Sequence, residues 1–198
     1  MFMVSFKKEM TVLDCCAAPG GKSFAAAMET RDSGEIISCD LHEHKIPLIQ
    51  KGAQRLGIQN HSAWQQDASV FVPQWENAMD TVIADVPCSG YGIIRKKPDI
   101  RYKNLTEVAE LPKLQKQILD NVSRYVKPGG TLLYATCTLT QAENEGMVSE
   151  FLRTHSDFAP QQLNLPTPFP KNESGMLSLV PGEYDTDGFF ISVMKRIK

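Results

Sequence analysis

Short apolar segments that each lead into a polar residue recur along this chain and alternate with stretches of helical character. Thr11–Cys15, Glu35–Cys39 and Met79–Ala84 are apolar segments, and stretches of helical composition follow the first two. Strands that alternate with helices favour a parallel sheet with helices on both faces. The pattern therefore predicts an α/β fold with a mostly parallel sheet from residue 11 to about residue 154.

Further elements follow from local composition. Additional strands are expected at Ser62–Gln66, Thr131–Ala135 and Phe189–Met194, and Met176–Val180 is a short apolar run. Helices are expected at Lys22–Met28, in a stretch ending at Leu56, from Pro112 to Tyr125 and at Glu143–Arg153. Pro112 is placed in the first helical turn because the missing N–H of proline costs nothing there. The long segment between Val86 and Glu110 is expected to be functional.

Polar side chains stand where the predicted strands end. In an open parallel sheet, ligands bind outside the carboxyl ends of the strands. The residues at these ends should therefore share one rim of the sheet: Asp14, Asp40, Asp67, Asp85 and Cys137.

Length and charge limit the function classes. A chain of 198 residues is most simply one domain. Its formal net charge of −2 argues against a basic coat for nucleic acid, although a local basic patch remains compatible with it. The chain has no apolar run that would span a bilayer and no secretory signal, which predicts the cytoplasm. Its five cysteines form no Cys-x-x-Cys pair, so we expect reduced thiols and no metal.

The turn after the first strand is Ala17-Ala18-Pro19-Gly20-Gly21 and lacks the Gly-x-Gly-x-x-Gly pattern of dinucleotide binders. A glycine turn between a strand and a helix brings a ligand close to backbone N–H groups. Asp40, after the next strand, has the position of an acid that holds a ribose in either a nicotinamide or an adenosyl cofactor. An ordinary turn and a helix-capping acid are the simpler interpretations of the same residues.

The cysteines divide into two groups. Cys15, Cys16 and Cys39 are expected to be small buried apolar residues. Cys88 and Cys137 lie on strand-exit loops, where reactive groups are displayed. A thiolate that adds to carbon 6 of a pyrimidine activates carbon 5 toward an electrophilic methyl group. An acid near ring nitrogen 3 and a base for the carbon 5 proton complete such a reaction.

Three motifs, in this order and on this alternation of elements, carry a resemblance: Asp14–Lys22, Asp85–Gly90 and Thr136–Thr138. They resemble the RNA 5-methylcytosine methyltransferases, most closely the bacterial Sun/Fmu type that acts on 16S ribosomal RNA. The similarity extends from about residue 11 to the end and includes Arg95–Asp99 and Thr186–Phe190.

The resemblance implies a Rossmann-like class I methyltransferase fold, a seven-stranded sheet with the last strand antiparallel, and S-adenosyl-L-methionine as the cofactor. It implies that Cys137 is the nucleophile, that Cys88 assists release of the adduct, and that Asp85 lies near the methyl group and the target base. The implied cofactor-binding residues are Cys16, Ala17, Ala18, Pro19, Gly20, Gly21, Lys22, Asp40, Asp67 and Asp85.

A basic run follows Cys88 and comprises Arg95, Lys96, Lys97, Arg101 and Lys103. Local basic patches position nucleic acid, so these residues are candidates for contacts with RNA phosphates. Tyr91 and Tyr102 are candidates for stacking on an unpaired base. A solvated charged loop is the alternative interpretation.

Residues 1–10 are expected to be a leader or the remnant of an upstream segment, and residues 11–198 the catalytic domain. Members of the resembled family carry an RNA-binding N-terminal domain before it. Transfer RNA or large-subunit ribosomal RNA is an alternative substrate. A cofactor- or RNA-binding module without turnover is an alternative of another class, and the absent glycine pattern disfavours a nicotinamide-dependent oxidoreductase. The oligomeric state and the modified cytidine stay open.

Overall fold

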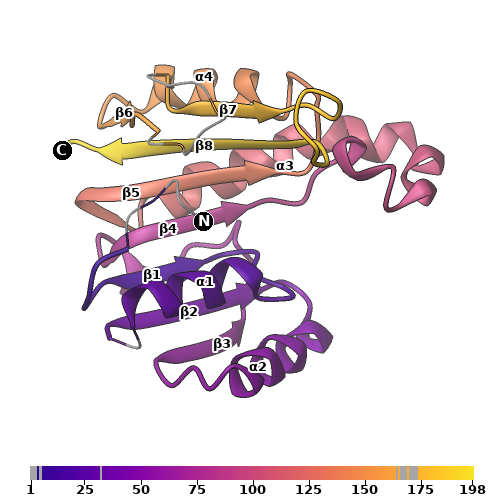
Figure 1. Ribbon diagram of the computed structural model, residues 1–198. Helices are drawn as coiled ribbons and strands as arrows, with labels where there is room; N and C mark the ends of the chain where they lie inside the picture. Colours follow the sequence, from indigo (N-terminus) through magenta and orange to yellow (C-terminus); the bar gives the residue numbers. More distant parts are fainter. Residues whose placement is uncertain (1–3, 5, 32, 164, 166–168, 170–173) are drawn as a thin grey trace.

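The computed structural model describes residues 4, 6–31, 33–163, 165, 169 and 174–198 (Figure 1). Within them, one sheet of eight strands has the order β3-β2-β1-β4-β5-β8-β6, with β7 also paired to β8. The strands are β1 Thr11–Asp14, β2 Glu35–Asp40, β3 His61–Gln65, β4 Met79–Asp85, β5 Val126–Thr136, β6 Phe158–Pro160, β7 Met176–Leu179 and β8 Phe189–Arg196. The helices are α1 Gly21–Thr30, α2 Ile46–Arg55, α3 Leu105–Ser123 and α4 Glu145–Thr154.

The first five strands are parallel. β1 pairs with β2 on one side and β4 on the other, and the strand order reverses at this point. β8 lies antiparallel to β5 at the far side of the sheet. The prediction of an α/β fold with a mostly parallel sheet and an antiparallel last strand is confirmed.

The outermost position of the sheet is divided between two short strands. β6 pairs with Met194–Arg196 of β8, and β7 pairs with Phe189–Ser192 of the same strand. The sheet therefore has eight strands in seven positions. β6 has no signal in the sequence, because three residues ending in a proline give no alternation to detect.

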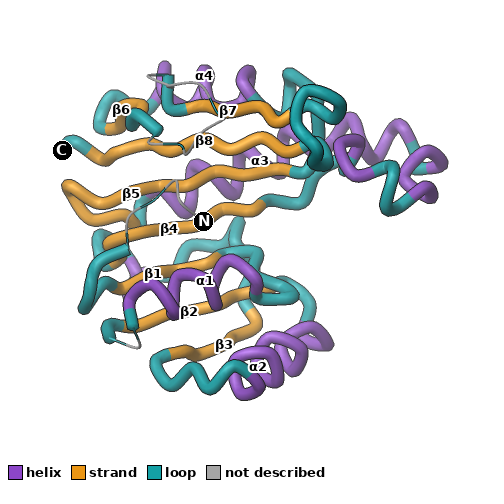
Figure 2. The backbone as a smooth tube through the Cα atoms, in the orientation of Figure 1, coloured by secondary structure: helices purple, strands orange, loops and turns teal. Residues whose placement is uncertain are grey.

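Helices cover both faces of the sheet (Figure 2). One face packs against α3 and α4 through Ile118, Val122, Val148 and Phe151. On the other face, α1 packs its alanines against the sheet, and Phe24 of α1 joins a smaller cluster with α2. Val4 and Phe6 are also buried against this second face. Among the described residues, no helix is long and apolar enough to cross a membrane.

The prediction for α3 was wrong at its start. The helix begins at Leu105 and runs through Pro112, with Asn104 capping it by accepting a hydrogen bond from the Thr106 N–H at 2.9 Å. The sequence reasoning placed Pro112 in the first turn because proline breaks the backbone hydrogen bond of a helix interior. Here the packing of the second half of α3 on the sheet outweighs that cost.

The other expectation about α3 concerned its end. The helix ends at Ser123, two residues before the predicted end, and Tyr125 lies in the connection to β5. The Lys127–Gly130 segment lies within β5, where the pairing with β4 shifts register between Met79 and Thr81.

We predict that Pro112→Ala stabilises the protein by about 1–2 kcal/mol. The substitution restores an N–H donor inside α3, and this gain of up to about 3 kcal/mol exceeds the entropy that the more flexible unfolded chain regains, about 1 kcal/mol. Urea denaturation measures the free energy of unfolding. Gln117→Ala, at an exposed position of the same helix, is the control and should change it little. An unchanged or lower stability of Pro112→Ala would contradict the prediction.

Candidate active site

The turn between β1 and α1 brings backbone to the rim of the sheet. Gly20 has a φ of 110°, a conformation that side chains rarely adopt, and a Cβ there would lie 2.3 Å from the Phe24 ring. Gly21 opens α1 and has free space where a side chain would stand. The Ala17 N–H donates to the Cys39 carbonyl at 2.8 Å, which ties the turn to the end of β2. The turn therefore presents the unpaired N–H groups of a helix start to a ligand.

Asp14 ends β1 directly beneath this turn. Its Oδ2 accepts a hydrogen bond from Ser23 Oγ at 2.7 Å, which joins the strand to the first turn of α1. Burial raises the pKa of Asp14 to about 6, against the lowering effect of the Ser23 hydrogen bond. Asp14 therefore supports the turn from below and stays out of solvent.

Asp40 and Asp67 lie at the ends of the next two strands. Asp40 is buried, and its carboxylate accepts hydrogen bonds from Ala18 N at 3.3 Å and His42 N at 3.1 Å. Lys45 Nζ lies 3.3 Å from Asp40 Oδ1. Asp67 Oδ1 accepts from Ser69 N at 2.8 Å and Ser69 Oγ at 2.7 Å. Both acids are held in place by neighbouring backbone, as expected for residues that orient a polar ligand.

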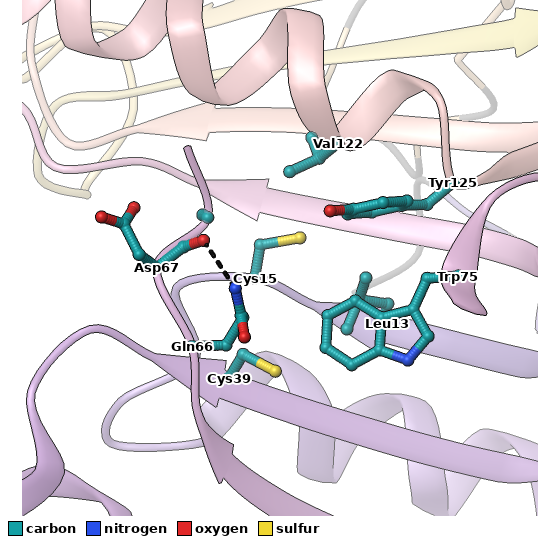
Figure 3. A pocket seen from close by; sticks show the side chains of 9 residues that line it. Leu13, Cys15, Cys39, Gln66, Asp67, Trp75, Val122 and Tyr125 are labelled. Carbon is teal, nitrogen blue, oxygen red and sulfur yellow. Dashed lines mark hydrogen bonds between the residues drawn. The ribbon is translucent and has the colours of Figure 1, made fainter. Parts of the chain in front are cut away.

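A small cavity of about 10 Å³ lies behind Asp67 (Figure 3). It has room for about one water molecule. Cys15, Cys39, Trp75 and Tyr125 line it, while the Asp67 carboxylate points away from it. Burial raises the pKa values of the Cys15 and Cys39 thiols. These two cysteines are buried core residues as expected, whereas Cys16, on the β1–α1 turn, is partly exposed.

Cys88 and Cys137 meet at the rim. Cys88 lies on the loop after β4 and Cys137 directly after β5, and their sulfur atoms are 3.2 Å apart. The Cys137 N–H also donates to Cys88 Sγ at 3.3 Å. Both side chains are partly exposed and all five cysteines of the chain are free thiols. The expected convergence of the two strand-exit cysteines is confirmed.

The two thiols differ in acidity. The hydrogen bond between the two sulfur atoms lowers the pKa of Cys137 below its ordinary value, and the charge of Lys103 acts in the same direction. Burial and the charge of Asp85 oppose this shift. The same hydrogen bond, with burial, raises the pKa of Cys88. Cys137 is therefore the thiol of the pair that ionises first, which is the property of a nucleophile.

Asp85 ends β4 beside the cysteine pair. Its Oδ2 forms an ion pair with Lys22 Nζ from the first turn of α1. About a third of each side chain is exposed, 35% for Asp85 and 39% for Lys22. The pair therefore joins the β1–α1 turn to the cysteine loops and remains open to a ligand.

The five residues of the basic run have different surroundings. Arg95 and Lys96 both pair with the buried Asp187, at 3.5 and 2.5 Å. Lys97 is exposed, and Arg101 Nε donates to the Pro98 carbonyl at 3.3 Å. These four side chains lie on the surface of the loop between β4 and α3.

Lys103 has a different place. Its Nζ donates to the Cys88 carbonyl at 3.3 Å and the Ser89 carbonyl at 2.8 Å, so it supports the loop that carries Cys88. Glu143, which the sequence reasoning did not single out, is buried beneath the same loop and accepts a hydrogen bond from the Ser89 N–H at 2.9 Å. The sequence signal for Glu143 is weak: it is an acid six residues after Cys137, at the predicted start of a helix.

Over residues 1–195 the chain matches the family described as 16S rRNA methyltransferase RsmB/F. The chain belongs to this family. It is 41% identical over 197 residues to the probable ribosomal RNA small subunit methyltransferase B of Bacillus subtilis. The aligned region covers 96% of the chain and 44% of that protein. Its counterpart in Synechocystis is 36% identical over 193 residues, 95% of the chain and 43% of that protein. The chain thus spans less than half the length of these relatives.

Solved structures give the same picture. NSun6 from Pyrococcus horikoshii, solved with SFG, superposes with a TM-score of 0.83 at 26% identity, over 97% of the chain and 49% of that protein. A SAM-dependent methyltransferase from Aquifex aeolicus superposes with a TM-score of 0.60 at 14% identity, over 96% of the chain and 84% of that protein. The second likeness concerns the fold alone, and with the first it confirms the expected methyltransferase fold.

We predict that Cys88→Ala raises the pH at which Cys137 reacts with iodoacetamide by about one unit, because the substitution removes the S–H group that stabilises the Cys137 thiolate. Alkylation rates of Cys137 are followed across pH by peptide mapping with mass spectrometry. Cys39→Ala, which removes a buried thiol away from the pair, is the control and should leave the midpoint unchanged. If the midpoint of Cys88→Ala equals that of the parent chain, Cys88 does not set the acidity of Cys137.

Proposed function

We propose that this chain is the catalytic region of an S-adenosyl-L-methionine-dependent RNA methyltransferase that modifies carbon 5 of a cytidine in small-subunit ribosomal RNA. The observation that carries the proposal is the pair of rim thiols 3.2 Å apart, with Asp85 at the end of the adjoining strand. Membership in the RsmB/F family supports the substrate class. Residues 11–198 form the catalytic domain in this proposal, and the cytoplasm is the compartment it implies.

The rim fits the cofactor. The open space at Gly21 and the N–H groups of the helix start suit its carboxylate, and residues 16–22 surround its methionine part. In this proposal Asp40 accepts hydrogen bonds from the ribose hydroxyls and Asp67 accepts one from the adenine amino group. NSun6 from Pyrococcus horikoshii was solved with SFG, an analogue of S-adenosylmethionine, which supports S-adenosyl-L-methionine as the cofactor. When bound, the cofactor supplies an electrophilic methyl group.

Residues of the chain carry out the remaining steps of the proposed reaction. The Cys137 thiolate forms a bond to carbon 6 of the cytosine, and the electron pair of the carbon 5–carbon 6 double bond becomes available at carbon 5. Asp85, as an acid, donates a proton toward ring nitrogen 3 and so stabilises the negative charge that develops there. After carbon 5 is methylated, a base removes its proton, the double bond re-forms and the Cys137 thiolate leaves. Cys88, in contact with Cys137, assists this release.

The surface loop between β4 and α3 is the proposed RNA contact, with Arg95, Lys96, Lys97, Arg101 and Lys103 as its cations. Lys97, Arg101 and Lys103 are exposed and have no carboxylate partner among the ion pairs of the described residues, whereas Arg95 and Lys96 pair with Asp187. Lys103 contributes through the Cys88 loop that it holds. Phosphate contacts of this kind position RNA and make its affinity depend on salt.

Cys137→Ala should lower methylation of a small-subunit ribosomal RNA transcript by about a thousandfold or more, because the nucleophile is lost. Its affinity for S-adenosylhomocysteine, measured by calorimetry, should stay within about twofold because Cys137 does not bind the cofactor. Asp40→Ala is the matched contrast and should lose that affinity while Cys137 keeps its reactivity with iodoacetamide. Equal loss of S-adenosylhomocysteine binding in both variants would contradict the role given to Cys137.

Lys97→Glu should weaken RNA binding and reduce the slope of log K against log salt concentration by about one. Lys97 is the better test than Lys96, because reversal at Lys96 also places two carboxylates together at Asp187. Fluorescence anisotropy with a labelled transcript at several salt concentrations measures both quantities. Lys51→Glu, the same charge change at an exposed position of α2, is the control. The same loss of slope in both variants would show a general charge effect and no local RNA contact.

A further inference from the structure

The loops that carry the two rim thiols are joined beneath them by a buried polar network centred on Glu143. We infer that Glu143 is the positioning residue that holds the Cys88 loop against the Cys137 loop, and so keeps the two sulfur atoms in contact. The catalytic purpose of this arrangement rests on the proposed function, but the contacts that support the inference are independent of that function.

Glu143 binds the Cys88 loop directly. Its Oε2 accepts from Ser89 N at 2.9 Å and its Oε1 accepts from Ser89 Oγ at 2.6 Å. Ser89 immediately follows Cys88, so its backbone and its side chain are both fixed by one carboxylate. Gln115 of α3 donates through Nε2 to Glu143 Oε2 at 2.8 Å and to the Pro87 carbonyl at 2.9 Å. The residues on both sides of Cys88 are therefore held in place, Ser89 by Glu143 directly and Pro87 through Gln115.

The same carboxylate is anchored to the Cys137 side. Thr140 Oγ1, on the loop after β5, donates to Glu143 Oε1 at 2.7 Å. The Glu143 carbonyl accepts from the Tyr134 hydroxyl of β5 at 2.7 Å. Thr138, next to Cys137, lies with its hydroxyl 2.6 Å from Ser89 Oγ. The neighbours of the two cysteines are therefore in direct contact, and Glu143 lies under that contact.

The charge of Glu143 is sustained by hydrogen bonds. Its exposed fraction is 2%, and no ion pair of Glu143 occurs among those formed by the described residues. Burial acts to raise its pKa, but the hydrogen bonds from Ser89, Thr140 and Gln115 together hold it below the ordinary value. A buried carboxylate without a cation is costly compared with an apolar residue. In return, this carboxylate accepts hydrogen bonds from four donors and so holds them in one arrangement.

A positioning role and a purely electrostatic role predict opposite shifts at Cys137. If Glu143 acted through its negative charge, its removal would lower the pKa of the Cys137 thiol. If it acts by holding Cys88 against Cys137, its removal loosens the hydrogen bond that stabilises the Cys137 thiolate, and that pKa rises. Asp85, Lys103 and Cys88, the other groups that act on Cys137, keep their chemical identity in each variant, so only their placement relative to Cys137 can change.

The test uses the whole chain and the pH dependence of Cys137 alkylation by iodoacetamide. Glu143→Gln and Glu143→Ala should move the midpoint upward by about half a unit or more, with the larger shift in the alanine variant. Ser89→Ala carries no charge change, breaks the hydroxyl link between Glu143 and Thr138, and should shift the midpoint in the same direction. Glu145→Gln removes a carboxylate bonded to Ser178 Oγ, outside the cysteine loops, and should cause no shift.

An unchanged or lower midpoint in Glu143→Gln and Ser89→Ala would overturn the inference. If Glu143→Ala does not fold, the other two variants decide the question, since Glu143→Gln keeps the side-chain shape and Ser89→Ala removes one oxygen atom. S-adenosylhomocysteine affinity should stay unchanged in the folded variants, and turnover on RNA should fall with little change in KM. The alkylation needs neither RNA nor cofactor, so a parent chain that fails to methylate would refute the proposed function and leave this result standing.

Discussion

The parallel pairing of β1 between β2 and β4 is the constraint on which the site depends. It fixes the register of three neighbouring strands so that Asp14, Asp40 and Asp85 end at one rim. β5 pairs with β4 in the same direction and carries Cys137 to the loop that holds Cys88. Two thiols separated by 49 positions in the sequence thereby come within 3.2 Å. Loss of this pairing would scatter every group on the rim.

The rim assigns different protonation states to chemically similar groups. Burial raises the pKa of Asp14, and the hydrogen bond with Cys137, together with burial, raises the pKa of Cys88. Asp85 forms an ion pair with Lys22 beside them. The hydrogen bond with Cys88 and the charge of Lys103 lower the pKa of Cys137, so its thiol is the more acidic of the pair. These differences arise from local surroundings and not from residue type.

The last strand, β8, contributes although its direction is reversed. The Gly188 N–H, just before β8, donates to the Gly92 carbonyl at 2.7 Å, and the Gly92 N–H donates to the Cys137 carbonyl at 3.0 Å. A Cβ at Gly92 would lie 2.2 Å from the Gly188 carbonyl oxygen, so this crossing needs glycine. Asp187 then orients Arg95 and Lys96. The end of the chain thus shapes the loop proposed to contact RNA.

The sequence by itself determined the alternation of strands and helices, the rim of strand-end acids and the choice of Cys88 and Cys137, because each depends on local pattern. It misplaced the start of α3, since packing on the sheet overrides the local cost of Pro112. Only the tertiary structure decided that Lys103 supports the Cys88 loop and that Glu143 lies beneath both cysteine loops. Their partners come from segments distant in the sequence, and the burial that makes a carboxylate depend on its donors exists only in the folded chain.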